Sequence, residues 1–335
     1  MNYKNDFNLQ GLVNDFILYA ESNGIKLSND FARHLFSSIG ASKLLVFPEG
    51  SYFYKYLIHV LSGYFGYELF VENVTDEWVS PSRLAQDTFG GETKITRGVA
   101  FSNQNPQSLT TVALFGVDFS KTQYLAPLAG YIRAPKLDWV YRIGSNNYKL
   151  GQNLWLALVA DRGMSLSPNI SKYGSWIETF DYEMISRFES SRSQGYYSGE
   201  NAPREMIINV KNFDNVSMDC FNELVSNALE SQEISLDYWK KIDKVEEYLC
   251  ALCSFKIDNI EARSLERYMA INLALGASEI EAVDSAIASK ILPILASYDR
   301  SKFVLQDIKL YDFIADLFGE QNVMKSLKVI RKMGL

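Results

Sequence analysis

Short apolar runs alternate with helical stretches through the first half of the sequence, and this order constrains the fold more than any single motif. The run LLVF at 44–47 precedes an apolar helical stretch near 53–65. The other strand candidates are 67–74, 110–117, 153–160 and 176–180. Strands that alternate with helices favour a parallel sheet with helices on both faces. The sequence therefore predicts an α/β core.

Helical patterns flank this core on both sides. Two amphipathic stretches occupy the first forty residues, the first ending at Asn23-Gly24 and the second capped by Ser28. From about Ser217 onward every stretch has apolar residues at a helical period, and Pro293 is expected to kink or end one helix. The predicted units are N-terminal helices at 1–40, an α/β core at 41–187, a loop or linker at 188–210 and a helical lid subdomain at 211–335.

Two segments of the core have less regular patterns. Residues 75–105 are rich in turn residues, which predicts a hairpin or a long loop there. The stretch SKTQYLAPLAGYI at 120–132 reads as a helix that follows the strand at 110–117.

Charge and hydropathy limit the partners of the chain. The formal net charge of −7 argues against a surface built for nucleic acid, because contacts to phosphates supply most of that affinity. A local basic face remains on the last helix, with the cations Lys325, Lys328, Arg331 and Lys332. No apolar run approaches the roughly 18–20 residues that span a bilayer, and the N-terminus lacks a signal-peptide pattern. We expect a cytoplasmic protein with no membrane partner.

Few residues are suited to metal binding or nucleophilic catalysis. The three cysteines are Cys220, Cys250 and Cys253, and the last two belong to an apolar helical stretch without a second ligand pair. His34 and His59 both fall on predicted helices among apolar neighbours, which favours structural roles over a catalytic triad. The sequence predicts neither a metal site nor a disulfide framework.

Several segments together resemble the McrB-type branch of the AAA+ ATPases, the motor subunits of modification-dependent restriction systems. ASKLLVF resembles the strand that leads into the phosphate-binding loop of that family, and residues 70–87 resemble a segment with a Trp and a Ser/Pro turn. TTVALFGVDFSKTQYLAPLAGYI stands where the magnesium strand is expected, and NLWLALVADRGMSLSPNISKYGSWIETF resembles the sensor strand and the final strand. The resemblance implies an AAA+-like sheet followed by a helical lid.

The phosphate-binding loop departs from the pattern G-x-x-x-x-G-K-[ST]. If Lys55 is the lysine, Glu49 and Tyr54 replace the two glycines and Tyr56 replaces the Ser/Thr. In the alternative register Pro48 and Phe53 replace the glycines and Tyr54 the lysine. Gly50 and Ser51 are the small residues that remain in this loop.

The other parts of the hydrolytic site are also altered. The two acidic residues of the magnesium strand are expected at Gly116 and Val117, and Asp118 is a displaced remnant. Asp161 stands at the sensor position, and residues 171–174 replace the expected arginine pair. The resemblance therefore implies a vestigial nucleotide site at Glu49, Gly50, Ser51, Lys55, Asp118 and Asp161.

From these features we expect a catalytically inactive subunit that assembles or regulates a prokaryotic defence or DNA-restriction complex. Its expected partners are an active AAA+ ATPase, a nuclease subunit or further copies of the chain, with DNA contacted only indirectly or through a local patch, and no cofactor is expected. One alternative is a divergent NTPase that uses Lys55, Asp118 and Asp161 with ATP or GTP and Mg²⁺. Another is a module that binds nucleic acid or a phage protein through residues 188–206 or the C-terminal basic face. An α/β domain with no nucleotide ancestry is the third.

Overall fold

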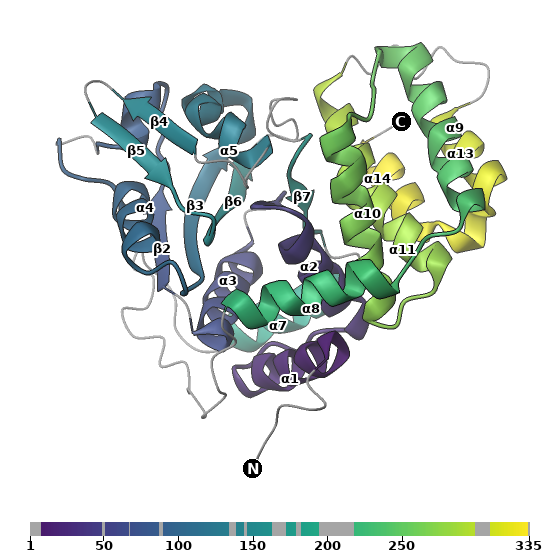
Figure 1. Cartoon of the computed structure of the whole chain (residues 1–335), viewed down its shortest axis with the longest axis horizontal. Helices are drawn as coiled ribbons and strands as arrows, with labels where there is room; N and C mark the ends of the chain where they lie inside the picture. The colour runs from purple at the N-terminus through teal and green to yellow at the C-terminus, as the bar shows by residue number, and fades with distance from the viewer. Residues whose placement is uncertain are drawn as a thin grey trace.

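A five-stranded parallel sheet forms the centre of the protein, in the order β2–β3–β6–β1–β7 (Figure 1). The structure, a computed structural model, describes residues 8–48, 51–66, 68–86, 90–133, 139–143, 146–162, 172–178, 182–193, 218–298 and 309–333. The strands are β1 (Leu44–Phe47), β2 (Glu68–Asn73), β3 (Thr110–Asp118), β6 (Leu154–Arg162) and β7 (Ser175–Trp176). This sheet confirms the predicted α/β core.

Helices cover both faces of the sheet because its central strands are apolar on both sides. Leu45 and Phe47 of β1 pack into a cluster with one group of helices, and Leu44 and Val46 pack into the opposite cluster. The first group comprises α1 (Leu9–Ser22), α2 (Asn29–Ala41), α3 (Tyr52–Phe65), α7 (Tyr182–Ser193) and α8 (Met218–Ser231). The second comprises α4 (Lys94–Gln104) and α5 (Ala129–Arg133).

The C-terminal helices form a separate cluster beside the sheet, which we call the lid (Figure 1). Its helices are α9 (Leu236–Cys253), α10 (Asn259–Ala274), α11 (Glu279–Ala286), α13 (Leu310–Phe318) and α14 (Met324–Met333). Ile271 of α10 and Leu275 belong to the core cluster that contains α2, so α10 joins the lid to the core. Pro293 lies where a π-helical turn at Ile287–Ile291 gives way to a 3-10 turn, as the sequence predicted.

The structure corrects the sequence prediction in three places. Residues 75–105 include the helix α4, whose start is capped by Thr93, the acceptor of the Thr96 N–H at 3.2 Å. The stretch 120–132, predicted as one helix, forms 3-10 turns as far as Leu128, because Pro127 removes a helical hydrogen bond, and only its last part belongs to the helix α5. A hairpin of β4 (Trp139–Ile143) and β5 (Asn146–Leu150) was not predicted. In addition, α7 continues to Ser193, past the start of the predicted loop at 188.

Candidate functional site

The carboxyl end of β1 lies at the position where open α/β sheets bind ligands. The chain leaves β1 for β2 at one edge of the sheet and returns later to β7 on the other side of β1. Such a reversal of strand order leaves a crevice beyond the carboxyl ends of the strands. A cavity of about 530 Å³ lies there, next to Pro48, which directly follows β1.

This cavity, which we call the sheet–lid cavity, has one wall from the core and one from the lid. The first turn of α2 and the end of β7 form the core wall, and α11, the turns after it and α14 form the lid wall. Apolar side chains make up much of the surface, namely Phe31, Pro48, Trp176, Ala288, Pro293, Ala296, Val329 and Met333. Cavities of this size and lining are typical of small-molecule sites.

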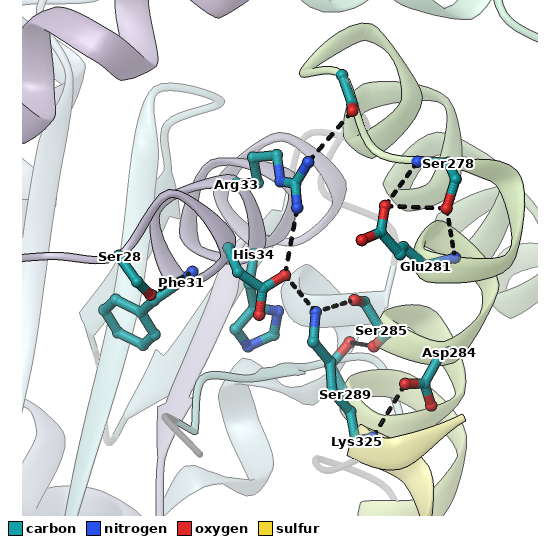
Figure 2. Close-up of polar contacts among 12 residues, drawn as sticks. Ser28, Phe31, Arg33, His34, Ser278, Glu281, Asp284, Ser285, Ser289 and Lys325 are labelled. Carbon is teal, nitrogen blue, oxygen red and sulfur yellow. Dashed lines mark hydrogen bonds and ion pairs between the residues drawn. The ribbon is translucent and has the colours of Figure 1, made fainter. Parts of the chain in front are cut away.

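Three lysines of α14 line the cavity. Lys325, Lys328 and Lys332 follow each other at spacings of three and four residues, which places them on one face of the helix. Lys325 Nζ donates to Asp30 Oδ1 at 2.6 Å and to Ser285 Oγ at 2.7 Å. Figure 2 shows Lys325 beside Ser285. Lys332 Nζ lies 2.5 Å from Glu178 Oε1. Both ion pairs join α14 of the lid to the core.

Asp284 of α11 fixes the position of α14. Its carboxylate accepts the N–H groups of Lys325 and Ser326, both at 2.9 Å, and the Ser326 hydroxyl at 2.6 Å. Two N–H groups of the first turn of α14 are thereby satisfied, and a negative charge faces the positive end of the helix dipole. Because Asp284 is buried, its pKa is raised despite these bonds. The lysines are therefore presented on a firmly capped helix.

His34 forms part of the core wall and is uncharged near neutral pH. Burial lowers its pKa to about 4, and the neighbouring Lys325 adds to this effect. His34 Nδ1 lies 2.6 Å from the hydroxyl of the fully buried Tyr268 on α10. The pair links α2 to the lid by a hydrogen bond between neutral groups.

Asp30 on α2 is shared between two cations. Its Oδ1 lies 3.5 Å from Arg33 Nη2 as well as 2.6 Å from Lys325 Nζ. Arg33 also donates to the carbonyl of Gly276 between α10 and α11, at 3.2 Å. Burial acts to raise the pKa of Asp30, but the attraction to Lys325, the hydrogen bond from Lys325 and the attraction to Arg33 act together against it, and the pKa of Asp30 is lowered.

The predicted nucleotide residues that the structure describes are not among the residues that line this cavity. Glu49 and Gly50 fall outside the described residues. Ser51 precedes α3, and its hydroxyl is buried without a hydrogen-bond partner. Lys55 Nζ lies 5.6 Å from the centre of the Phe115 ring of β3. Neither Ser51 nor Lys55 is among the residues that line the sheet–lid cavity.

Asp118 and Asp161 meet in a second, smaller cavity at the carboxyl ends of β3 and β6. It has a volume of about 250 Å³ and is also lined by Asp76 and Lys121. Lys121 Nζ lies 3.7 Å from Asp76 Oδ1 and 3.8 Å from Asp118 Oδ2. The Asp118 carboxylate also accepts the N–H and hydroxyl of Ser120. Its charge is thus already paired with groups of the chain.

The predicted basic face divides into two sides of α14. Lys325, Lys328 and Lys332 line the cavity, whereas Arg331 lies on the outer side with Glu320 at 3.9 Å and its guanidinium donates to the Tyr311 hydroxyl. Sequence reasoning did not find the groups that face the lysines. Asp30 and Glu178 lie far from α14 in the sequence, and no local pattern marks them. Within the core wall, the sequence predicted only the Ser28 cap, which marks where α2 begins.

The chain matches no protein-family model and no curated protein. Among the helices that the structure describes, none combines the length and apolarity needed to cross a bilayer. In the part of the chain that the structure describes, no group of three or more His, Cys, Asp or Glu side chains is arranged so that it could hold a metal ion.

Proposed function

We propose that the chain is a catalytically inactive, AAA+-like subunit of the McrB type, which assembles or regulates a prokaryotic defence or DNA-restriction complex. The arrangement of a parallel sheet with a docked helical lid is consistent with the two-part plan that the sequence resemblance implies. An inactive subunit with this architecture would form interfaces with neighbouring subunits but would not hydrolyse nucleotide.

The start of α3 is the observation that carries this proposal. Phosphate binding requires small residues, a lysine and a hydroxyl group where the helix begins. Here Phe53 and Tyr54 are fully buried, Tyr56 is 5% exposed, and all three belong to the core cluster. The Tyr54 ring packs against Phe47 of β1, with ring centres 5.3 Å apart. This aromatic packing, at positions where phosphate-binding groups are expected, supports the proposal that the chain does not hydrolyse a Mg²⁺–nucleotide.

Hydrolysis assays with purified protein test the inactive state. ATP and GTP with Mg²⁺ should give no turnover above background, and Lys55→Ala should behave like the wild type. Lys26→Ala, which removes an exposed surface lysine, is the matched control. Turnover that Lys55→Ala abolishes and Lys26→Ala preserves would contradict the proposal and support the divergent NTPase.

Co-expression with an intact McrB-like ATPase from the same genome tests the assembly role. We expect the two chains to elute together and light scattering to give a mass that includes both. Separate elution at micromolar concentrations, with the chain folded, would refute the subunit role.

The proposal does not favour direct DNA binding through α14. Two of the four cations of that face, Lys325 and Lys332, form ion pairs with carboxylates of the core. Arg331 on the outer side has Glu320 and Tyr311 as neighbours. If the face binds DNA nonetheless, affinity will fall steeply with salt and with Arg331→Ala.

A further inference from the structure

The strand β2 forms a regular and partly exposed edge of the parallel sheet. It ends the sheet order, and Figure 1 shows it beside β3. Its six residues pair with β3 from Glu68↔Thr110 to Asn73↔Phe115 without a register shift. Every residue of β2 is at least partly exposed, whereas all four residues of β1 are buried. The strand at the opposite edge, β7, has only two residues.

Alternate backbone groups of β2 point away from the sheet. The Val74 N–H donates to the Phe115 carbonyl of β3 at 2.8 Å. Because the N–H and C=O groups alternate in direction from one residue to the next, those of Leu69, Val71 and Asn73 face outward. In the part of the chain that the structure describes, these outward groups have no hydrogen-bond partner. The strand has no proline and no bulge, two features that protect an edge from pairing.

The two faces of β2 differ in charge. Glu68 and Glu72 lie on the same face, because alternate side chains of a strand share a face. Glu72 accepts the N–H of Lys94 at the start of α4, at 2.7 Å, and neither carboxylate forms an ion pair with a described residue. On the other face Leu69 and Val71 are half-buried against the core cluster. The edge therefore presents unpaired backbone groups between an acidic face and an apolar face.

We propose that an extended segment of a partner protein binds this edge as a sixth strand of the sheet. Its side chains on one face would be basic, beside Glu68 and Glu72. Those on the other face would be apolar, beside Leu69 and Val71. Strand addition is a general mode of peptide recognition, in which backbone hydrogen bonds give affinity and alternate side chains give specificity.

The charge of β2 favours a basic segment over a second copy of the chain. Two paired β2 strands would bring four carboxylates and no cation to their shared edge, because the strand ELFVEN has two glutamates and no basic residue. The inference goes beyond the proposed function, since it depends on the edge of the sheet and holds for a chain of any family.

A synthetic peptide with this pattern tests the inference on the full chain. Lys-Val-Thr-Val-Lys, blocked at both ends, has the same side chains in either direction and spaces its lysines like Glu68 and Glu72. In an NMR titration the amide signals of Leu69, Val71 and Asn73 should shift, and their hydrogen exchange should slow. Glu-Val-Thr-Val-Glu should bind about tenfold more weakly, because like charges replace two ion pairs. Unaffected amides at about 1 mM of the basic peptide would overturn the proposal.

Two N-methylated forms of the basic peptide test the backbone hydrogen bonds. Antiparallel pairing turns the N–H groups of both valines toward β2, and parallel pairing turns that of the threonine toward it. Methylation of the groups that face β2 should weaken binding about tenfold, whereas methylation of the others should leave it unchanged. The two forms are matched controls for each other, and the weaker one gives the direction of the added strand. Equal affinities of the two forms would overturn the proposal.

Variants of the chain locate the peptide. Glu68→Lys should weaken the basic peptide about fivefold, and Glu247→Lys, which reverses an exposed carboxylate of α9, is the matched control. Val71→Pro removes an outward N–H, which an edge strand tolerates, and should abolish binding. Melting temperatures show whether each variant is folded, and if Val71→Pro is not, Glu68→Lys and the methylated peptides still decide. Equal effects of Glu68→Lys and Glu247→Lys would overturn the proposal.

Light scattering of the chain without peptide tests a second copy as the occupant. A monomer, or a dimer that Val71→Pro retains, agrees with the proposal. A dimer that folded Val71→Pro converts to a monomer would make the second copy the occupant and overturn it. Because none of these measurements involves hydrolysis or an ATPase partner, their failure leaves the proposed function standing.

Discussion

The buried pair His34–Tyr268 predicts a specific loss of stability in mild acid. Burial lowers the pKa of His34 from 6.5 to about 4 in the folded state. Between these values the unfolded chain binds a proton that the folded chain does not, so stability falls as the pH falls through this window. For pKa values of 6.5 and about 4, lowering the pH from about 7.5 to about 5 removes about 2 kcal/mol of unfolding free energy.

Glu261 complicates the wild-type measurement. Burial raises the pKa of Glu261 to about 7, so the folded chain binds the extra proton between 4.5 and about 7. Its contribution to stability therefore rises as the pH falls, which offsets that of His34 over nearly the same window. A pH profile of the wild type alone would not separate the two groups.

The variant His34→Asn separates them. Asparagine places an amide near the position of Nδ1, where it keeps a hydrogen bond to Tyr268, and it does not titrate. Urea unfolding of both proteins at about pH 7.5 and about pH 5 gives two differences in free energy. The wild type should lose about 2 kcal/mol more than His34→Asn. If both proteins lose the same amount, His34 titrates normally in the folded state and the buried, neutral imidazole is refuted.

Three substitutions test other parts of the fold. Asp284→Asn should lower the free energy of unfolding, measured in urea, by about 1–3 kcal/mol, because an amide accepts hydrogen bonds from the first N–H groups of α14 less well than a carboxylate does. An unchanged free energy would mean that this cap does not stabilise the fold. Gly116→Ala should cost about 1–3 kcal/mol, since Gly116 has φ of +78° and a Cβ would lie 3.1 Å from the Val74 carbonyl oxygen, and a neutral result would contradict that backbone. Gly98→Ala should cost a similar amount by overpacking, because a Cβ on α4 would lie 2.4 Å from Val112 Cγ2 of β3; an unchanged melting temperature would exclude this close helix–strand contact.

The strands at the centre of the parallel sheet were predictable because each leaves a pattern within a few residues. LLVF is apolar throughout, and TTVALFGV and NLWLALVA are apolar after their first one or two residues, as is typical of strands covered on both faces; each of the three segments contributes a strand to the sheet. The helix α4 was missed because GGETKITRGVAFSNQ mixes glycine and threonine with few apolar residues. Packing of Ile95 and Val99 against β3 stabilises this helix, and helix propensity does not include such tertiary contacts.

The candidate site was harder to predict because its groups are brought together by the tertiary structure. The basic residues of α14 were visible in the sequence, but their division into cavity and outer sides depends on which face packs on the lid. Leu327 and Ile330 are buried in the lid cluster, and this burial turns the neighbouring lysines toward α2. Sequence periodicity predicts which face of a helix is apolar, but it does not predict which element packs against that face.

The position of the lid relative to the core determines whether the sheet–lid cavity exists. Lys325 and Lys332 belong to α14 of the lid, whose first turn is capped by Asp284. Their acidic partners Asp30 and Glu178 belong to the core. The apolar contact of α10 with α2 fixes the two parts together away from the cavity, at Ile271 and Leu275. Both ion pairs span the boundary between the lid and the core. A ligand that contacted both walls would therefore add to the contacts that dock α14 on the core.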